Sequence, residues 1–146
     1  MVSGRARSGF EMADHPADLR FRVWAPDRET LFRQAARALL ALLFPDGESG
    51  GIGDGGGTAE VAVRLEGVDA DDLLVRWLGE LLFQAETRRL APAAIDFLQL
   101  DEGQLRADCT MRRTGPPSRE IKAVTYHQTG IGETGEGLEA TLLLDV

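Results

Sequence analysis

Two stretches with helical periodicity, set among stretches with strand periodicity, constrain the fold of this chain most. The apolar residues of segments 28–44 and 69–85 recur every three or four positions, which is typical of amphipathic helices. Asp27 and Asp69 stand at the starts of these segments, and a short acidic side chain at that point can accept a hydrogen bond from the first turn. We therefore expect two helices, each with one face buried against other elements.

Alternation of apolar and polar residues in the remaining segments predicts strands with one buried face. The predicted strands are 19–24, 59–66, 93–100, 104–111, 120–127 and 137–145. The order β-α-β-α-β-β-β-β predicts an α+β fold, a two-layer sandwich with two amphipathic helices packed on a mixed β-sheet of about six strands. We expect residues 1–10 to be a flexible N-terminal lead-in and residues 11–146 to form a single domain.

Composition argues against several classes of function. The formal net charge of −8 disfavours direct binding of a nucleic-acid backbone. No apolar run approaches the ~20 residues that span a bilayer, and residues 1–8 lack the apolar core of a signal peptide, so we expect a cytoplasmic protein that does not bind membranes. Cys109 is the only cysteine, which excludes an intrachain disulfide and a cysteine-based zinc site.

Two segments match the spacing G-x-G-x-x-G, residues 51–56 and residues 130–135. A dinucleotide-binding loop of this kind follows a strand and opens a helix, so that the helix N-terminus meets the pyrophosphate. The first segment follows a predicted helix, and the second lies between two predicted strands. We therefore interpret both as flexible loops.

The segment 120–127 places charged, phenolic and imidazole side chains in an otherwise apolar strand. A side-chain period of two puts Lys122 and Tyr126 on one face and Ile121 and Ala123 on the other. One interpretation is a lysine and a tyrosine at an ordinary sheet edge, with their apolar stems packed and their polar ends in water. The other is a functional pair of side chains.

Acidic residues occur at the start of the first predicted strand and at the end of the last one. Asp14 and Asp18 flank His15, and Asp145 lies one residue from the C-terminal end of the sequence. If the two strands are neighbours, Asp18 and Asp145 could converge on a hard divalent cation, which prefers carboxylate oxygens. The alternative is that Asp14 and Asp18 are turn residues and that the Asp145 side chain is solvated.

Four motifs together resemble the archease family. Residues 14–18 (DHPAD) look like the archease signature, an acidic residue followed by His-Thr-Ala-Asp. The other three motifs are similar to its second helix, its most distinctive strand and its apolar-Asp-apolar ending: 73–83 (LLVRWLGELLF), 120–127 (EIKAVTYH) and 142–146 (LLLDV). They occur in the family's order from about Phe10 to Val146. Pro16 departs from the pattern, because it replaces the usual threonine and removes its hydroxyl.

The resemblance implies a single archease-like domain over residues 11–146. Its role would be that of a non-catalytic protein cofactor that activates an RtcB-type RNA ligase in tRNA splicing and RNA repair, by promoting ligase guanylylation and multiple turnover. The family pattern implies a metal site at Asp18 and Asp145, with His15 as a weaker third ligand. The ion would be divalent, calcium in the first place, with magnesium or manganese as alternatives. Lys122 and Glu120 match the positions implied for ligase activation.

Two other functions stay open. A stand-alone metal-dependent hydrolase could use Asp18 and Asp145 with His15 or His127 as general base. A general chaperone for RNA-processing proteins would need no such site. Turnover of nucleotides or RNA without a ligase would favour the hydrolase, and rescue of unrelated clients would favour the chaperone.

Overall fold

The computed structural model describes residues 7–14, 18–45 and 57–146, except for the side chains of residues 13, 14, 18 and 127–129. Its helices are α1 (Arg28–Leu43) and α2 (Ala70–Phe83), and α2 continues into one π-helical turn, η1 (Gln84–Arg88). The strands are β1 (Gly9–Asp14), β2 (Asp18–Ala25), β3 (Thr58–Glu66), β4 (Leu90–Leu100), β5 (Gln104–Arg113), β6 (Ala123–Thr134) and β7 (Gly137–Asp145).

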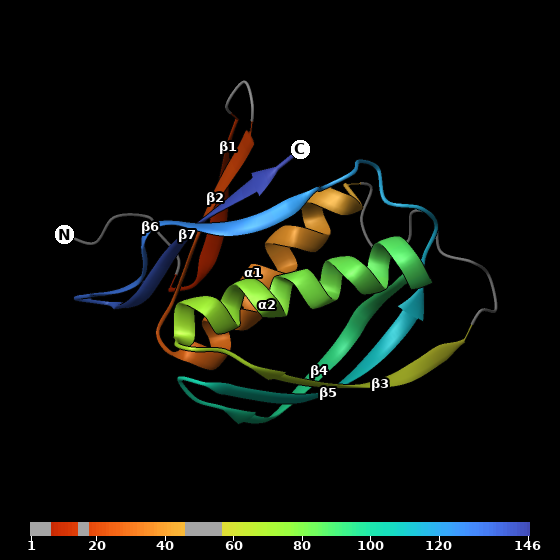
Figure 1. Ribbon diagram of the computed structural model, residues 1–146, viewed down its shortest axis with the longest axis horizontal. Coiled ribbons are helices and arrows are strands. Elements are labelled where there is room, and N and C mark those ends of the chain that lie inside the picture. Colours follow the sequence, from red (N-terminus) through yellow and green to blue (C-terminus); the bar gives the residue numbers. More distant parts are fainter. Residues whose placement is uncertain (1–6, 15–17, 46–56) are drawn as a thin grey trace.

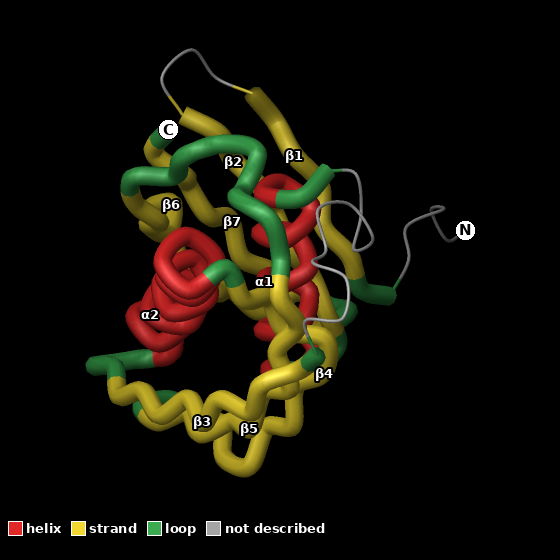
Figure 2. Tube along the Cα trace, turned by 90° about the vertical axis from the view of Figure 1, so that its right-hand side faces the viewer, coloured by secondary structure: helices red, strands yellow, loops and turns green. Residues whose placement is uncertain are grey.

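The strands form two antiparallel sheets with the helices between them (Figure 1). Sheet A has the order β1-β2-β7-β6, and sheet B has the order β3-β5-β4. Figure 2 shows α2 with sheet A on one side and sheet B on the other. The predicted α+β class with two amphipathic helices is confirmed, whereas two antiparallel sheets take the place of one mixed sheet. The apolar surface of α2 is too wide for one sheet to cover, since six of its residues are buried.

Both helices begin where the sequence predicts. Asp27 Oδ1 accepts a hydrogen bond from the Thr30 amide at 2.8 Å, and Asp69 Oδ1 accepts one from the Asp72 amide at 2.8 Å. The hydrogen bond from the Thr30 backbone holds the pKa of Asp27 below its ordinary value. No helix in the described part of the chain is both long and apolar enough to cross a membrane.

Trp77 ties the helices to each other and to sheet B. Its side chain is fully buried, and its indole Nε1 donates a hydrogen bond to the Phe32 carbonyl of α1 at 3.0 Å. The ring of Phe97 on β4 lies 5.4 Å away between centroids, tilted by 56°. The Arg33 guanidinium lies 4.9 Å from the centre of the same Phe97 ring. This cluster holds the helix layer in a fixed place against β4.

Two local predictions are wrong. β1 begins at Gly9, inside the expected lead-in, and it continues to Asp14, which the alternative interpretation placed in a turn. β6 continues to Thr134, so Gly130 and Gly132 lie in a strand and not in a flexible loop. Both segments become strands because each pairs antiparallel with the next strand along the chain, β1 with β2 and β6 with β7, and the ladder hydrogen bonds extend further than the apolar alternation does. The other glycine motif, residues 51–56, lies outside the described residues.

Candidate functional site

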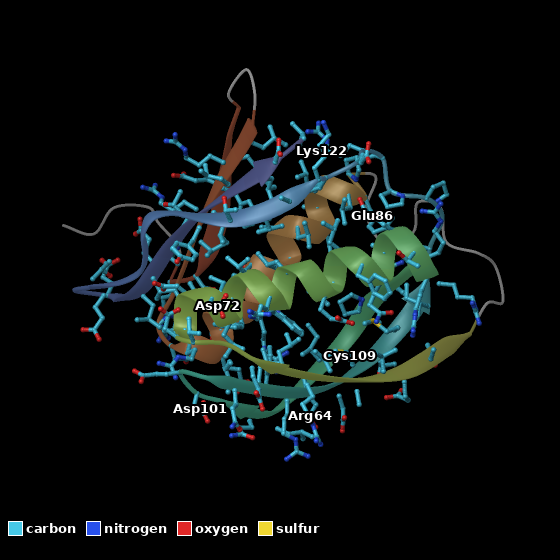
Figure 3. The ribbon with its side chains drawn as sticks, viewed as in Figure 1. Arg64, Asp72, Glu86, Asp101, Cys109 and Lys122 are labelled. Atoms are coloured by element: carbon cyan, nitrogen blue, oxygen red, sulfur yellow. The ribbon has the colours of Figure 1, made fainter. Side chains whose placement is uncertain are left out.

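Three segments that the sequence singled out meet at one end of sheet A. Asp18 and Asp145 face each other across the β2–β7 ladder, and Asp145 also faces Ala123 of β6. The Lys122 amide donates a hydrogen bond to the Asp145 carbonyl at 2.7 Å. The condition that the predicted first and last strands be neighbours is therefore met. Figure 1 shows the end of β7 between β2 and β6, and Figure 3 places Lys122 at this end of the molecule.

Carboxylates at the positions of Asp18 and Asp145 are a suitable donor set for a hard cation. Residues directly opposite each other in an antiparallel ladder lie on the same face, with Cβ atoms about 4.5–5.5 Å apart. The Asp145 side chain is exposed, whereas the Asp18 side chain and all of His15 lie outside the described residues. Two like charges at directly opposed positions repel each other, and a divalent cation removes that repulsion.

Among the side chains that the structure describes, no group of three or more His, Cys, Asp or Glu residues could hold a metal ion. The two other predicted ligands, Asp18 and His15, are not among those side chains. A metal site at this end of sheet A therefore stays a prediction.

The strand of Lys122 starts later than the sequence predicts. β6 begins at Ala123, and Ala123 is exposed while Val124 is buried. Ile121 is also buried, so the predicted face shared by Ile121 and Ala123 is wrong. The alternation breaks because Ile121 and Lys122 precede the strand and do not follow its pleat. Lys122 is exposed, and it is the only lysine in the chain.

Glu120 lies beside a groove and outside the β6 ladder. It is exposed and lines this groove together with Glu86 and Arg89, which follow α2. Glu86 also accepts a hydrogen bond from the Ile121 amide at 3.4 Å. The sequence singled out Glu120 but not Glu86 or Arg89, because helical periodicity carries no information about what lies across from the end of a helix.

Asp71 is a structural residue that the sequence reasoning missed. Its Oδ1 accepts a hydrogen bond from the Ile131 amide at 2.7 Å, which joins the first turn of α2 to β6. Gly130, next to it, has φ of +65°, and an added Cβ would lie 2.2 Å from Asp71 Oδ2. The contact sits at a bulge, since residues 127–130 of β6 lie between the pairs Tyr126–Leu142 and Ile131–Ala140. Glycine within a strand-like pattern was the signal that could have predicted a bulge here.

Cys109 is fully buried in β5. Burial raises the pKa of its thiol to about 11, so the group is neutral at neutral pH. Cys109 is therefore a residue of the hydrophobic core. His127, the alternative general base, has no described side chain.

These features define a small α+β protein in which two antiparallel sheets enclose a helix pair and a polar site lies at one end of the larger sheet. A family model described as the Archease protein family (MTH1598/TM1083) matches residues 10–146. The chain belongs to the archease family, as the resemblance of its motifs predicted.

Curated relatives and solved structures agree with this assignment. The chain is 30% identical over 147 residues to the archease of Methanosarcina barkeri (strain Fusaro / DSM 804), with 94% of this chain and 95% of that protein covered. It is 30% identical over 142 residues to the archease of Archaeoglobus fulgidus, covering 94% and 98%.

Two solved structures share its fold. The solution structure of Methanobacterium thermoautotrophicum protein 1598 matches with a TM-score of 0.67 and 26% identity, covering 94% and 99% of the two chains. The crystal structure of a Thermotoga maritima archease, described as a possible chaperone, matches with a TM-score of 0.59 and 20% identity, covering 92% and 94%.

Proposed function

We propose that this protein is a non-catalytic cofactor of an RtcB-type RNA ligase, and that it promotes guanylylation of the ligase and multiple turnover. The observation that supports the proposal is the meeting of Asp18, Asp145 and Lys122 at one end of sheet A in a member of the archease family. These three residues match the positions that the family resemblance implied for a metal site and for ligase activation.

The proposed site would combine two sources of positive charge. Asp18 and Asp145 would hold a divalent ion, calcium in the first place, and the bound ion would supply positive charge for phosphate oxygens. Lys122 offers a second positive charge, since its side chain is exposed and an ammonium group has three hydrogen-bond donors. Its backbone is held by the hydrogen bond to Asp145, so Lys122 stays next to the proposed ion site.

Such a site suits the charge of guanylylation chemistry. Transfer of a nucleotidyl group builds negative charge on phosphate oxygens, and positioned cations stabilise that charge. Lys122 would therefore act on the ligase-bound nucleotide, while the ligase supplies the nucleophile. The proposed role demands no nucleophile from this chain.

The test is a guanylylation assay with the RtcB-type ligase encoded by the same genome. With labelled GTP, the wild-type protein is expected to increase the guanylylated fraction of the ligase and the number of RNA joining events per ligase. Lys122→Ala and Asp145→Ala are expected to lose this effect, whereas Arg64→Ala is expected to keep it. Arg64 is a matched control because it is an exposed cation on the opposite side of the molecule (Figure 3). Full stimulation by folded Lys122→Ala and Asp145→Ala proteins would refute the proposal.

A chaperone role is a second candidate, because the Thermotoga maritima relative is described as a possible chaperone. A chaperone would keep unrelated aggregation-prone proteins in solution, and the Lys122→Ala variant would retain that ability. Strict dependence on the ligase and on Lys122 would exclude this candidate. Incubation of the protein with GTP and RNA alone tests the stand-alone hydrolase, which predicts turnover without ligase.

A further inference from the structure

A groove lies where α2 ends and faces the segment that leads into β6. Its volume is about 410 Å³, and its lining residues are Glu86, Arg89, Pro116, Pro117, Arg119 and Glu120. One wall comes from η1 and the residue after it, and the other comes from the loop between β5 and β6. Figure 3 labels Glu86 in this region, close to Lys122 in the view.

Hydrogen bonds hold both walls of the groove in place. The Thr114 amide donates to the Arg89 carbonyl at 2.8 Å, and the Ser118 amide donates to the Leu43 carbonyl at 2.8 Å. The backbone of Arg89 has φ of +56°, the only positive φ of a non-glycine residue in the described part of the chain. A π-helical turn and a left-handed residue side by side are features that often occur at functional sites. The groove is therefore formed before any partner binds.

Basic side chains gather around this groove although the chain is acidic overall. Arg89 and Arg119 line the groove and are exposed, and the exposed Lys122 follows two residues after Glu120. Arg113 pairs with Leu90 in the β4–β5 ladder, next to Arg89. The lining itself carries two arginines and two glutamates, so the excess of positive charge comes from Arg113 and Lys122 beside the groove, on a chain whose formal charge is −8. Guanidinium groups bind carboxylates and phosphates through paired hydrogen bonds.

The lining residues favour a protein segment over a nucleic-acid backbone as the occupant of the groove. Glu86 and Glu120 place two carboxylates in the groove, and a nucleic-acid backbone would meet both with its own negative charge. A protein segment can instead place a carboxylate on Arg89 or Arg119 and turn its amide or basic groups toward the glutamates. Pro116 and Pro117 supply rigid apolar contacts for the same segment.

We propose that this groove docks an acidic segment of the ligase surface and thereby holds Lys122 over the ligase active site. The inference depends on the proposed function, because it takes the ligase as the partner. It adds a docking residue, Arg119, that neither the family motifs nor the metal site includes. Docking and activation then belong to different residues, Arg119 and Lys122.

The test is to titrate each protein variant against a fixed amount of ligase and to measure the guanylylated fraction. Arg119→Glu is expected to raise the concentration for half-maximal stimulation about tenfold or more, since it reverses a charge in the contact, and to leave the plateau unchanged. Arg119→Lys is expected to lie between Arg119→Glu and the wild type. Lys122→Ala is expected to lose the plateau at every concentration. Arg64→Glu, a charge reversal on sheet B, is expected to match the wild type.

Each failure has its own meaning. A wild-type titration curve for Arg119→Glu, with the plateau still lost in Lys122→Ala, would overturn the docking inference and leave the proposed function standing. Absence of stimulation by the wild-type protein would overturn the proposed function itself. Binding of a labelled single-stranded RNA by the protein alone, lost in Arg119→Glu, would overturn the docking inference in favour of a nucleic-acid site. The melting temperature of Arg119→Glu shows whether the variant is folded.

Discussion

The Asp145→Asn variant should be more stable than the wild-type protein without a divalent ion. It should be less stable than the wild-type protein when the ion is added. Asp18 and Asp145 are directly opposed in the β2–β7 ladder. Without an ion, two carboxylates at such positions repel each other, and Asp145→Asn removes one charge while keeping the shape of the side chain. With an ion, the wild-type protein gains binding free energy that the variant loses.

The size of each effect follows from the spacing. Opposed like charges about 5 Å apart cost about 0.2–1 kcal/mol on an exposed sheet face. The variant should therefore melt about 1–3 °C higher than the wild type in the absence of ions, at about 3 °C per kcal/mol for a chain of this length. An ion at a hundred times its dissociation constant stabilises the wild type by about 2.7 kcal/mol, which corresponds to about 8 °C.

The assay is thermal unfolding of chelator-treated protein, followed by titration with calcium, magnesium and manganese. Asp108→Asn is the matched control, because Asp108 and Asp96 are also directly opposed on an exposed sheet face. Arg64 and Arg106 form the next pair on that face, two residues along the β3–β5 ladder. This control should keep the full ion-induced shift. An ion-induced shift in Asp145→Asn equal to that of the wild type would refute the reasoning.

Three further predictions concern stability and reactivity. Asp71→Ala should destabilise the protein by about 1–3 kcal/mol, because the Ile131 amide loses its acceptor. Asp71→Asn keeps an acceptor oxygen, so it should lower the free energy of unfolding clearly less. Chemical denaturation measures both variants, and equal losses of stability would contradict the role of this hydrogen bond. Asp27→Ala should cost about 0.5–2 kcal/mol at pH 7 through loss of the N-cap. The pKa of Asp27 is lowered in the folded protein, so its contribution is present above the unfolded pKa and is lost as the pH falls through the folded pKa; denaturation at pH 7 and pH 2 should show the cost shrinking in acid. Burial raises the pKa of the Cys109 thiol to about 11, so it should resist a thiol reagent at pH 8 until the protein unfolds, and rapid labelling of the folded protein would contradict its burial.

Much of the candidate site could be predicted from the sequence, because its residues belong to local motifs. Asp18, Lys122 and Asp145 all come from short segments whose residue types are unusual for a strand. Their meeting, however, depends on the pairing of β2 with β7 and of β7 with β6, over a separation of more than a hundred residues in the first case. From the sequence, we could only assume that the first and last predicted strands are neighbours. No local pattern specifies which strand edge another strand will join.

The parts of the site that were missed involve contacts between distant elements. Glu86 and Arg89 form a groove only because the loop that leads into β6 passes the end of α2. Asp71 is an ordinary first-turn acid in the sequence, and it gains its role only when α2 packs beside Gly130. The periodicity of a helix predicts its buried face, but not the partner of an individual polar side chain.

The sequence by itself determined the two helices, their N-caps, most of the strands and the candidate residues. Hydrogen bonds within a turn and burial of alternate residues act over a few positions, so a local pattern records them. Only the tertiary structure decided that the strands divide into two sheets around the helices, that β1 joins the edge of sheet A, and that Lys122 lies beside Asp145. Pairing between strands depends on edges brought together by the whole chain, and the free energy of that choice is shared among many side chains.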